Sequence, residues 1–157
     1  MKQFKTITML FVMLFIVKIC IAGVLPRFVS LKSNEVNLRA GPSKNYPIKW
    51  VIKNKGEPVE VITEFEQWRE IRDKDGDSGW VHEAMLSGNR SVVVISDIAQ
   101  SLYRDSEGSK KIAQINRGVR AKLLTCQNEW CYISVDKYKG WIARNVLWGV
   151  FKDERFD

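Results

Sequence analysis

From residue 24 onward, apolar and polar residues alternate over short stretches, and turn residues interrupt them. Val59-Glu60-Val61 and Lys122-Leu123-Leu124 are typical of these stretches, while Pro42, Gly56 and residues 73–76 separate such stretches. No window of helix length carries a sustained period of about 3.6 residues. Short strands with turn signals between them predict an all-β chain that folds as a small barrel or sandwich.

Two dipeptides with turn character precede tryptophans. Asp75-Gly76 comes shortly before Trp80, and Lys139-Gly140 comes directly before Trp141. A tight turn followed by an aromatic strand residue is typical of a hairpin that continues into its second strand. We therefore predict a turn at each dipeptide and a strand through each tryptophan.

The chain after residue 24 contains two copies of one sequence unit, in which matching residues occur in the same order. The matched segments are Asn37-Leu38-Arg39 with Ser101-Leu102-Tyr103, Lys55-Gly56 with Arg117-Gly118, Val61-Ile62 with Leu123-Leu124, Trp68 with Trp130, and Gly79-Trp80-Val81 with Gly140-Trp141-Ile142. We predict two tandem small β-barrels, at residues 28–90 and 93–150, and a loosely ordered charged tail at residues 151–157. A unit of this size is only marginally stable alone, so we expect the two copies to dock.

The N-terminal segment predicts an exported protein. Lys2 and Lys5 precede an apolar run over residues 7–17, and the small residue Ala22 follows. This pattern is typical of a secretory signal peptide, which we place at residues 1–22. The run is too short to span a bilayer core of about 30 Å as a helix, and an uncleaved N-terminal anchor is the alternative. Membrane contact is expected only through such an uncleaved N-terminus, and the rest of the chain is expected in the periplasm or cell envelope.

The charged residues give no reason to expect a nucleic-acid partner. The 25 Lys and Arg residues exceed the 18 Asp and Glu residues by +7, but Lys2, Lys5 and Lys18 lie in the predicted signal peptide. The remaining charges are interspersed and form no basic block. With one histidine and three cysteines, the chain has few of the residues that form a zinc site or a catalytic triad. We therefore expect no enzymatic activity, no metal and no cofactor.

Cys126 and Cys131 are the two cysteines outside the predicted signal peptide, and they flank four residues that could form a hairpin loop. In such a hairpin the two cysteines lie opposite each other, and an oxidising compartment favours a disulfide between them. A redox-active pair and a metal site are the alternatives, but the spacing is not Cys-x-x-Cys and further ligands are absent nearby. The corresponding residues of the first copy, Glu64 and Arg69, could pair by charge.

Two further features do not indicate a chemical site. His82 has no nucleophile within reach, so we expect an exposed strand residue rather than a general base. Asp73, Asp75 and Asp77 alternate in a pattern similar to a calcium-binding loop, but Lys74 adds repulsion and His82 stands where the bidentate acid is needed. A hairpin turn is the better interpretation of this segment.

The string of residues 36–43, Val-Asn-Leu-Arg-Ala-Gly-Pro-Ser, resembles the bacterial SH3-like (SH3b) domain family, together with Trp68 and Gly79-Trp80-Val81. The second copy departs from the pattern at its opening, where Asp105-Ser106 replaces Gly41-Pro42. The whole chain is similar to tandem SH3-like exported proteins of the alphaproteobacterial type. The resemblance implies a curved barrel of about five to seven strands per copy. It also implies a module of the kind that targets cell-wall hydrolases to peptidoglycan or its stem peptides.

Five residues of the first copy are candidates for ligand binding. Tyr46 and Trp50 follow Gly41-Pro42, in a region that would border the peptide groove of an SH3-like barrel, and they have no aromatic counterpart in the second copy. An aromatic groove suits an extended peptide, and packing between the copies is the alternative. Trp68 and Trp80 recur in the second copy, which also fits a role in the core.

Arg39 is the fifth candidate. We expect its guanidinium to lie near a barrel end and to pair with a carboxylate such as Glu70 or Asp73. A structural role for this pair is the alternative to a role in ligand binding.

These features predict a non-enzymatic binding module of the cell envelope. Its expected ligand contains a peptide, either a peptidoglycan stem peptide or a segment of an envelope protein, and binds through the SH3-like grooves. The alternative is a structural or regulatory scaffold that docks an envelope enzyme and does not bind the wall. Fold alone does not decide between these functions.

Overall fold

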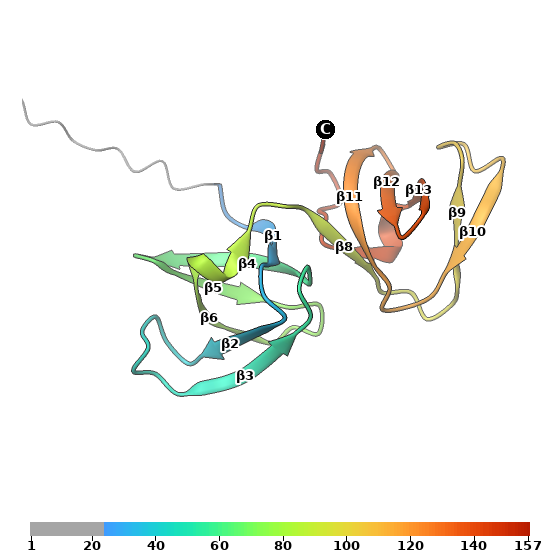
Figure 1. Cartoon of the computed structure of the whole chain (residues 1–157). Coiled ribbons are helices and arrows are strands. Elements are labelled where there is room, and N and C mark those ends of the chain that lie inside the picture. Colours follow the sequence, from blue (N-terminus) through green and yellow to red (C-terminus); the bar gives the residue numbers. More distant parts are fainter. Residues whose placement is uncertain (1–23) are drawn as a thin grey trace, which may run out of the picture.

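The computed structural model describes residues 24–157, so the predicted signal peptide at residues 1–22 lies outside the described residues. Two antiparallel sheets follow one another along the described part of the chain (Figure 1). The strands of the first sheet are β1 (Arg27–Leu31), β2 (Glu35–Arg39), β3 (Ile48–Lys53), β4 (Pro58–Phe65), β5 (Trp68–Arg72), β6 (Ser78–His82) and β7 (Leu86–Ser87). The strands of the second are β8 (Ser91–Val94), β9 (Gln100–Tyr103), β10 (Lys111–Ile115), β11 (Arg120–Gln127), β12 (Trp130–Val135), β13 (Tyr138–Ala143) and β14 (Leu147–Trp148).

The two sheets have the same topology. The strand order is β3-β2-β6-β5-β4-β1-β7 in the first and β10-β9-β13-β12-β11-β8-β14 in the second. Each strand of the second sheet therefore has the same position in its sheet as the strand numbered seven lower has in the first, so that β8 corresponds to β1 and β14 to β7. A single 3-10 turn precedes the last strand in both, η1 (Glu83–Met85) and η2 (Arg144–Val146). The predicted all-β fold with two tandem copies of one unit is confirmed.

Each sheet curls around its own hydrophobic core. In the first barrel the core includes Val36, Leu38, Val59, Val61, Ile71 and Val81. In the second it includes Leu102, Leu123, Ile133 and Ile142 at matching positions. Most of these residues alternate with exposed or half-buried neighbours along their strands, as the period of two requires. On β4, Glu60 between Val59 and Val61 is also buried and pairs with Arg72. Full burial of one such aliphatic side chain stabilises the fold by about 1.5–3 kcal/mol.

The glycine before each repeated tryptophan is required by a close approach of two strands. A Cβ atom on Gly140 would lie 2.6 Å from the carbonyl oxygen of Tyr103, and one on Gly79 would lie 3.0 Å from that of Arg39. Both distances are too short for a side chain without movement of the neighbouring strand. The Gly-Trp pair thus follows from the packing of β6 on β2 and of β13 on β9.

One predicted turn is present and the other is misplaced. The Asp73 carboxylate accepts hydrogen bonds from the backbone N–H groups of Asp75 (3.0 Å) and Asp77 (2.9 Å), which closes the β5–β6 turn. Lys139-Gly140 lies inside β13 instead, so the prediction of a turn there is wrong. The β12–β13 turn comes earlier, with Val135 opposite Tyr138 and Asp136 at a φ of 49°. An aspartate tolerates this left-handed conformation better than most residues do.

The two barrels contact each other through apolar and polar groups. The ring of Phe28 lies edge-on to that of Trp148, with centroids 5.0 Å apart. The indole N–H of Trp148 also donates to the carbonyl oxygen of Pro58 at 3.2 Å. On the polar side, Arg120 donates to the carboxylate of Glu57 at 3.1 Å. The expected docking of the two copies is therefore present in the structure.

The C-terminal tail packs against the second barrel, so the prediction of a loosely ordered tail is wrong. The backbone N–H of Cys126 donates to the carbonyl oxygen of Phe156 at 2.8 Å, as in an added strand. The carboxylate of Glu154 receives two hydrogen bonds from Arg90, at 2.5 and 3.0 Å. The buried guanidinium of Arg144 donates to the backbone oxygens of Phe151 and Glu154. Charged tail residues are ordered here because buried arginines supply their partners.

Within residues 24–157 the structure contains no helix that is long and apolar enough to cross a membrane.

Candidate functional site

Three large apolar side chains are exposed at one edge of the first barrel. Tyr46 is 47% exposed, Ile48 is 47% exposed and Trp50 is 53% exposed. Ile48 and Trp50 lie on β3, which is the edge strand of its sheet. We call Tyr46, Ile48 and Trp50 the β3 surface. Exposed apolar groups gathered at one place are typical of interaction sites, whereas isolated ones are common on any protein.

The strand register places two more of the predicted residues beside this surface. Ile48 is opposite Arg39 on β2, and Arg39 is opposite Trp80 on β6. Directly opposite residues in antiparallel strands project from the same face of the sheet. Ile48, Arg39 and Trp80 therefore form a row across the outer face of the barrel, since Leu38, Gly79 and Val81 beside them are buried. Trp50 lies outside this row, because the register of β2 and β3 shifts between Leu38 and Arg39 and leaves Trp50 opposite Leu38.

Arg39 has a different partner from the one expected. Its guanidinium donates to the backbone oxygens of Lys44 (3.0 Å) and Tyr46 (2.8 Å), and it forms no ion pair with Glu70 or Asp73. The carboxylate pairing predicted for Arg39 is therefore wrong. The loop between β2 and β3 folds back toward Arg39, so the guanidinium binds carbonyl oxygens of this loop instead of a carboxylate. Arg39 thereby fixes the position of Tyr46.

Gly41 is also needed for the position of Tyr46. A Cβ atom on Gly41 would come within 2.6 Å of the Tyr46 ring. The ring thus lies directly against the glycine backbone. Gly41 and Arg39 together hold the aromatic ring at the edge of the barrel, so this part of the β3 surface is organised before any ligand arrives.

Trp68 has a supporting position. It is only 9% exposed, and its ring lies edge-on to the His82 imidazole with centroids 5.5 Å apart. The Nδ1 atom of His82 accepts a hydrogen bond from the backbone N–H of Ala84 at 3.2 Å. Trp68 therefore contributes packing area rather than a free surface.

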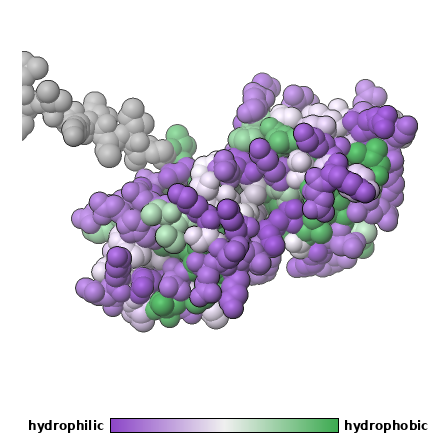
Figure 2. All heavy atoms as spheres, viewed as in Figure 1, coloured by the Kyte–Doolittle hydropathy of each residue, from purple (hydrophilic) through white to green (hydrophobic). Residues whose placement is uncertain are grey.

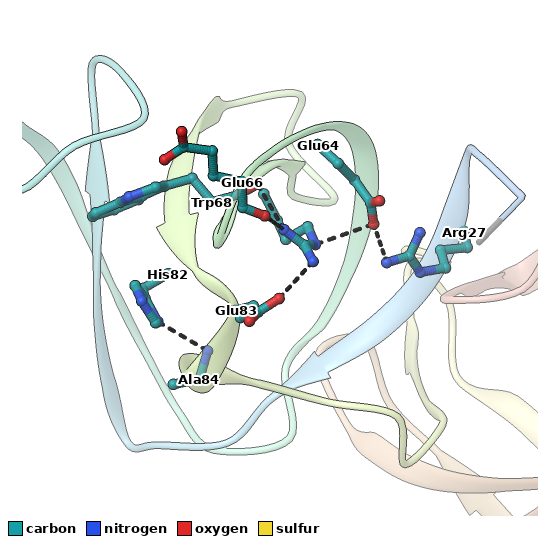
Figure 3. Close-up of polar contacts among 8 residues, drawn as sticks. Arg27, Glu64, Glu66, Trp68, His82, Glu83 and Ala84 are labelled. Atoms are coloured by element: carbon teal, nitrogen blue, oxygen red, sulfur yellow. Dashed lines mark hydrogen bonds and ion pairs between the residues drawn. The ribbon is translucent and has the colours of Figure 1, made fainter. Parts of the chain in front are cut away.

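An ionic network lies around Trp68 at the end of the β4–β5 hairpin (Figure 3). The carboxylate of Glu64 pairs with Arg27 and, at 3.1 Å, with Nε of Arg69. Arg69 also pairs with Glu83 at 2.5 Å. The predicted pairing of Glu64 with Arg69 is confirmed. The sequence did not predict the pairing of Arg27 and Glu83 with this hairpin, because they come close to it only when β1 and η1 fold onto it.

Hydrophobic residues reach the surface of both barrels (Figure 2), and the second barrel exposes Tyr138, but it has no exposed aromatic residue at the position of Trp50. Ala113 lies opposite Leu102, where Trp50 lies opposite Leu38 in the first barrel. Tyr103 takes the place of Arg39, and its ring lies edge-on to that of Trp130 at 5.7 Å. The aromatic side chains on this face therefore pack against one another.

The loop that replaces Gly41-Pro42 is closed by Asp105. Its carboxylate accepts hydrogen bonds from the hydroxyl of Ser109 (2.6 Å) and from the backbone N–H groups of Ser109 (3.0 Å) and Glu107 (3.2 Å). These hydrogen bonds, that of the Ser109 hydroxyl above all, hold the pKa of Asp105 below its ordinary value. Asp105 thus closes this loop with its own side chain, in place of the arginine and glycine that organise the loop of the first barrel.

The predicted disulfide joins Cys126 and Cys131, whose Cα atoms are 4.1 Å apart on the paired strands β11 and β12. No group of three or more His, Cys, Asp or Glu residues that could hold a metal ion occurs within residues 24–157. Asp73, Asp75 and Asp77 form the hairpin turn described above.

Comparison with known proteins gives the family and several distant relatives. The sequence profile of the family described as "Bacterial SH3 domain" matches residues 32–88 and 102–149. A curated protein of Bacillus subtilis (strain 168), "Putative N-acetylmuramoyl-L-alanine amidase YrvJ", is 25% identical over 128 residues, which cover 74% of this chain and 24% of that protein. The chain thus spans about a quarter of the length of this relative.

Two solved structures from Trichomonas vaginalis are also similar. NlpC2 matches with a TM-score of 0.38 and 14% identity, over 82% of this chain and 50% of that one. NlpC1 matches with a TM-score of 0.33 and 12% identity, over 78% and 45%. The family profile covers both repeats and more than half of the chain, and the two sheets share one topology. The chain therefore belongs to the bacterial SH3 domain family, with two consecutive SH3-like barrels.

Proposed function

We propose that this protein is a non-catalytic binding module of the cell envelope, in which the first SH3-like barrel recognises an extended peptide through the β3 surface. We assign the first module to residues 28–90 and the second to residues 93–150. The single observation that carries this proposal is the exposure of Ile48 and Trp50 on the edge strand β3 and of Tyr46 in the loop directly before it. The peptide belongs to peptidoglycan, and the protein is exported to the envelope through its N-terminal segment.

The geometry of β3 suits an extended ligand. An edge strand presents backbone N–H and C=O groups that a peptide can pair with, and the neighbouring side chains give specificity. Tyrosine and tryptophan offer large contact areas with few rotatable bonds, so little side-chain entropy is lost on binding. Arg39 adds to this by holding the backbone of Tyr46 in place.

The sequence similarity supports the wall as the source of the ligand. The curated relative carries the name of an N-acetylmuramoyl-L-alanine amidase, and this chain matches only a part of it. In that relative, the matching part is a candidate for the segment that binds rather than cleaves. We extend this division of labour to the present chain, in which the single histidine, His82, packs on the Trp68 ring and accepts from the backbone N–H of Ala84.

A scaffold that docks an envelope enzyme is the second candidate. The second barrel has no counterpart of the exposed Trp50, which favours this candidate, because Ala113 and Tyr103 stand where Trp50 and Arg39 stand in the first. In this candidate the second barrel stabilises the first, and the β3 surface contacts a protein instead of the wall.

Sedimentation with purified peptidoglycan sacculi separates the two candidates. The protein is mixed with sacculi that have been stripped of covalently attached proteins, and the bound fraction is measured in the pellet. Binding to the stripped sacculi supports recognition of a wall peptide. A protein that is folded and oxidised but stays in the supernatant contradicts the wall ligand and leaves the scaffold.

A further inference from the structure

A cleft of about 500 Å³ lies between the two barrels, away from the β3 surface. The first barrel lines it with the end of β1 and the turn before β4, where Lys32 and Lys55 lie. The second barrel lines it with β11, which carries Lys122, and with the end of β12 at Asp136. The junction between the barrels also lines the cleft, through Ser87, Asn89, Arg90 and Ser91. This volume is within the usual range for small-ligand pockets, which is about 300–1,000 Å³.

Contacts between the barrels hold the walls of the cleft in place. The hydroxyl of Ser91 in the second barrel donates to the carbonyl oxygen of Gly56 in the first at 2.6 Å. Within the first module, the hydroxyl of Ser30 donates to the carbonyl oxygen of Asn89 at 2.7 Å, just before β8 begins. Arg120, another lining residue, pairs with the buried Glu57 of the first barrel. The cleft is therefore a fixed feature of the docked pair of barrels, and neither barrel forms it alone.

The charges that line the cleft are unbalanced. Five cationic residues face one acid, Asp136. Arg90 and Arg120 have carboxylate partners in Glu154 and Glu57. The other three cations are Lys32, Lys55 and Lys122, and within residues 24–157 none of them forms an ion pair at 4.0 Å or less. Three lysines without a carboxylate partner around one concave site create a positive potential that attracts anions.

The remaining lining favours a peptide over a simple anion. Leu31, Ala121 and Val135 are the apolar residues of the lining, and of these the half-buried Val135 exposes the most surface, which a fully hydrated inorganic ion would not use. Asp136 would repel a polyanion but can accept hydrogen bonds from an amine or a peptide N–H. A ligand with carboxylates, an amide backbone and a free amine therefore fits all the groups on the wall.

We propose that the cleft between the barrels is a second binding site, which takes a short acidic peptide. The carboxylates of the peptide contact Lys32, Lys55 and Lys122, and its amine or N–H groups contact Asp136. This site goes beyond the proposed function, because it does not depend on the β3 surface and uses residues of both barrels. It also gives the second barrel a role in binding that its own outer face does not provide.

Calorimetry with a soluble stem tetrapeptide, released from sacculi by an amidase, tests this proposal. The variant Lys32→Gln/Lys55→Gln/Lys122→Gln should bind the tetrapeptide at least about tenfold more weakly than the wild type, because exposed charge pairs and their long-range field are lost. The matched control is Lys111→Gln, an exposed lysine on β10 outside the cleft, and its affinity should equal that of the wild type. Amidation of the peptide carboxylates should weaken binding to the wild type in the same way.

Three outcomes overturn the proposal: no binding of the tetrapeptide, unchanged affinity of the triple variant, or equal affinity for the amidated peptide. The Trp50→Ala variant separates the cleft from the β3 surface. If Trp50→Ala loses the tetrapeptide while the triple lysine variant keeps it, the peptide lies on the β3 surface and the cleft proposal fails. If the tetrapeptide binds in the cleft but intact sacculi are not bound, the cleft proposal stands and the proposed function fails.

Discussion

Glu64 and Arg69 are paired across the β4–β5 hairpin at the register position that a disulfide occupies in the second barrel. Glu64 is opposite Arg69 in the first sheet, and Cys126 is opposite Cys131 in the second. The same hairpin is thus joined by an ion pair in one copy and by a covalent bond in the other. The two links respond differently to their surroundings, because salt weakens an ion pair and a reductant breaks a disulfide.

Removal of the disulfide should weaken the second barrel. The double variant Cys126→Ala/Cys131→Ala should lose about 2 kcal/mol of unfolding free energy, since the bond closes only a short loop. Urea denaturation followed by tryptophan fluorescence measures this loss. Reductant should lower the stability of the wild type by a similar amount and leave the variant unchanged. Two thiols that can be alkylated in the native, non-reduced protein would contradict a disulfide here.

The glycine before Trp141 should be among the most sensitive positions of the fold. Gly140→Ala places a methyl group 2.6 Å from the backbone oxygen of Tyr103, so β9 and β13 must separate, at a cost of about 1–3 kcal/mol. Gly88→Ala is the matched control, because no atom lies within 4 Å of a Cβ at that position. Thermal unfolding of both variants measures the difference. Equal melting temperatures would show that the strands are not closely packed at Gly140.

Glu154 should stabilise the tail at neutral pH. Burial alone would raise the pKa of this carboxyl, but hydrogen bonds from Arg90 and from the N–H of Phe151, with the charges of Arg90 and Arg144, hold it below its ordinary value. The stability that Glu154 contributes is therefore present above the unfolded-state pKa and is lost as the pH falls through the lower, folded-state pKa.

The variant Glu154→Gln should accordingly lose about 1–3 kcal/mol at pH about 7, and its difference from the wild type should shrink in acid. Urea unfolding at several pH values gives both quantities. Asp153→Asn, an exposed neighbour in the same tail, should change little. A difference from the wild type that stays constant down to strongly acidic pH would contradict the role of the Glu154 carboxylate.

Glu57 should show the opposite behaviour. Burial raises the pKa of its carboxyl above the ordinary value, although the charge and the hydrogen bond of Arg120 act in the other direction. In the folded protein the ionised form is therefore disfavoured, and stability falls as the pH rises from the unfolded-state pKa through the folded-state pKa.

We expect Glu57→Gln to be neutral or more stable by up to about 1 kcal/mol at neutral pH, because its amide oxygen still accepts from Arg120. This advantage should vanish below the unfolded-state pKa, and Glu35→Gln on the exposed face of β2 should show no such dependence. Urea unfolding against pH checks the sign. A Glu57→Gln variant that is clearly destabilised at neutral pH would show that the ion pair between the barrels outweighs the burial of the carboxylate.

The repeat and the all-β class follow from the sequence because they depend on local patterns. Alternating residues such as Val36 and Leu38, and the glycine before each repeated tryptophan, are visible along the chain and set the strands. The pairing of Glu64 with Arg69 and of Cys126 with Cys131 could be inferred because the hairpin joins residues close in sequence. The family resemblance then supplied the barrel.

Besides the local error in the position of the β12–β13 turn, the wrong predictions concern residues whose partners are set by tertiary folding. Arg39 donates to the backbone oxygen of Tyr46 because the intervening loop folds back. The pattern of charged residues in the sequence could not predict a backbone carbonyl as the partner. The tail is ordered because Glu154 binds Arg90, which is far away in sequence, and because Arg144 donates to the backbone oxygen of Glu154. The cleft between the barrels requires both barrels and their docking, so a reading of either repeat alone could not find it.

The most direct test of the proposed recognition surface is the affinity of Trp50→Ala for purified sacculi, measured by sedimentation beside the Tyr138→Ala variant. Both residues are large, aromatic and exposed, but Tyr138 lies on the second barrel, away from the β3 surface. We predict that Trp50→Ala keeps the melting temperature of the wild type and loses most of the binding, by about 2 kcal/mol or more as at other aromatic hot spots, while Tyr138→Ala binds normally. Unchanged binding by Trp50→Ala, or equal loss in both variants, would contradict recognition through the β3 surface.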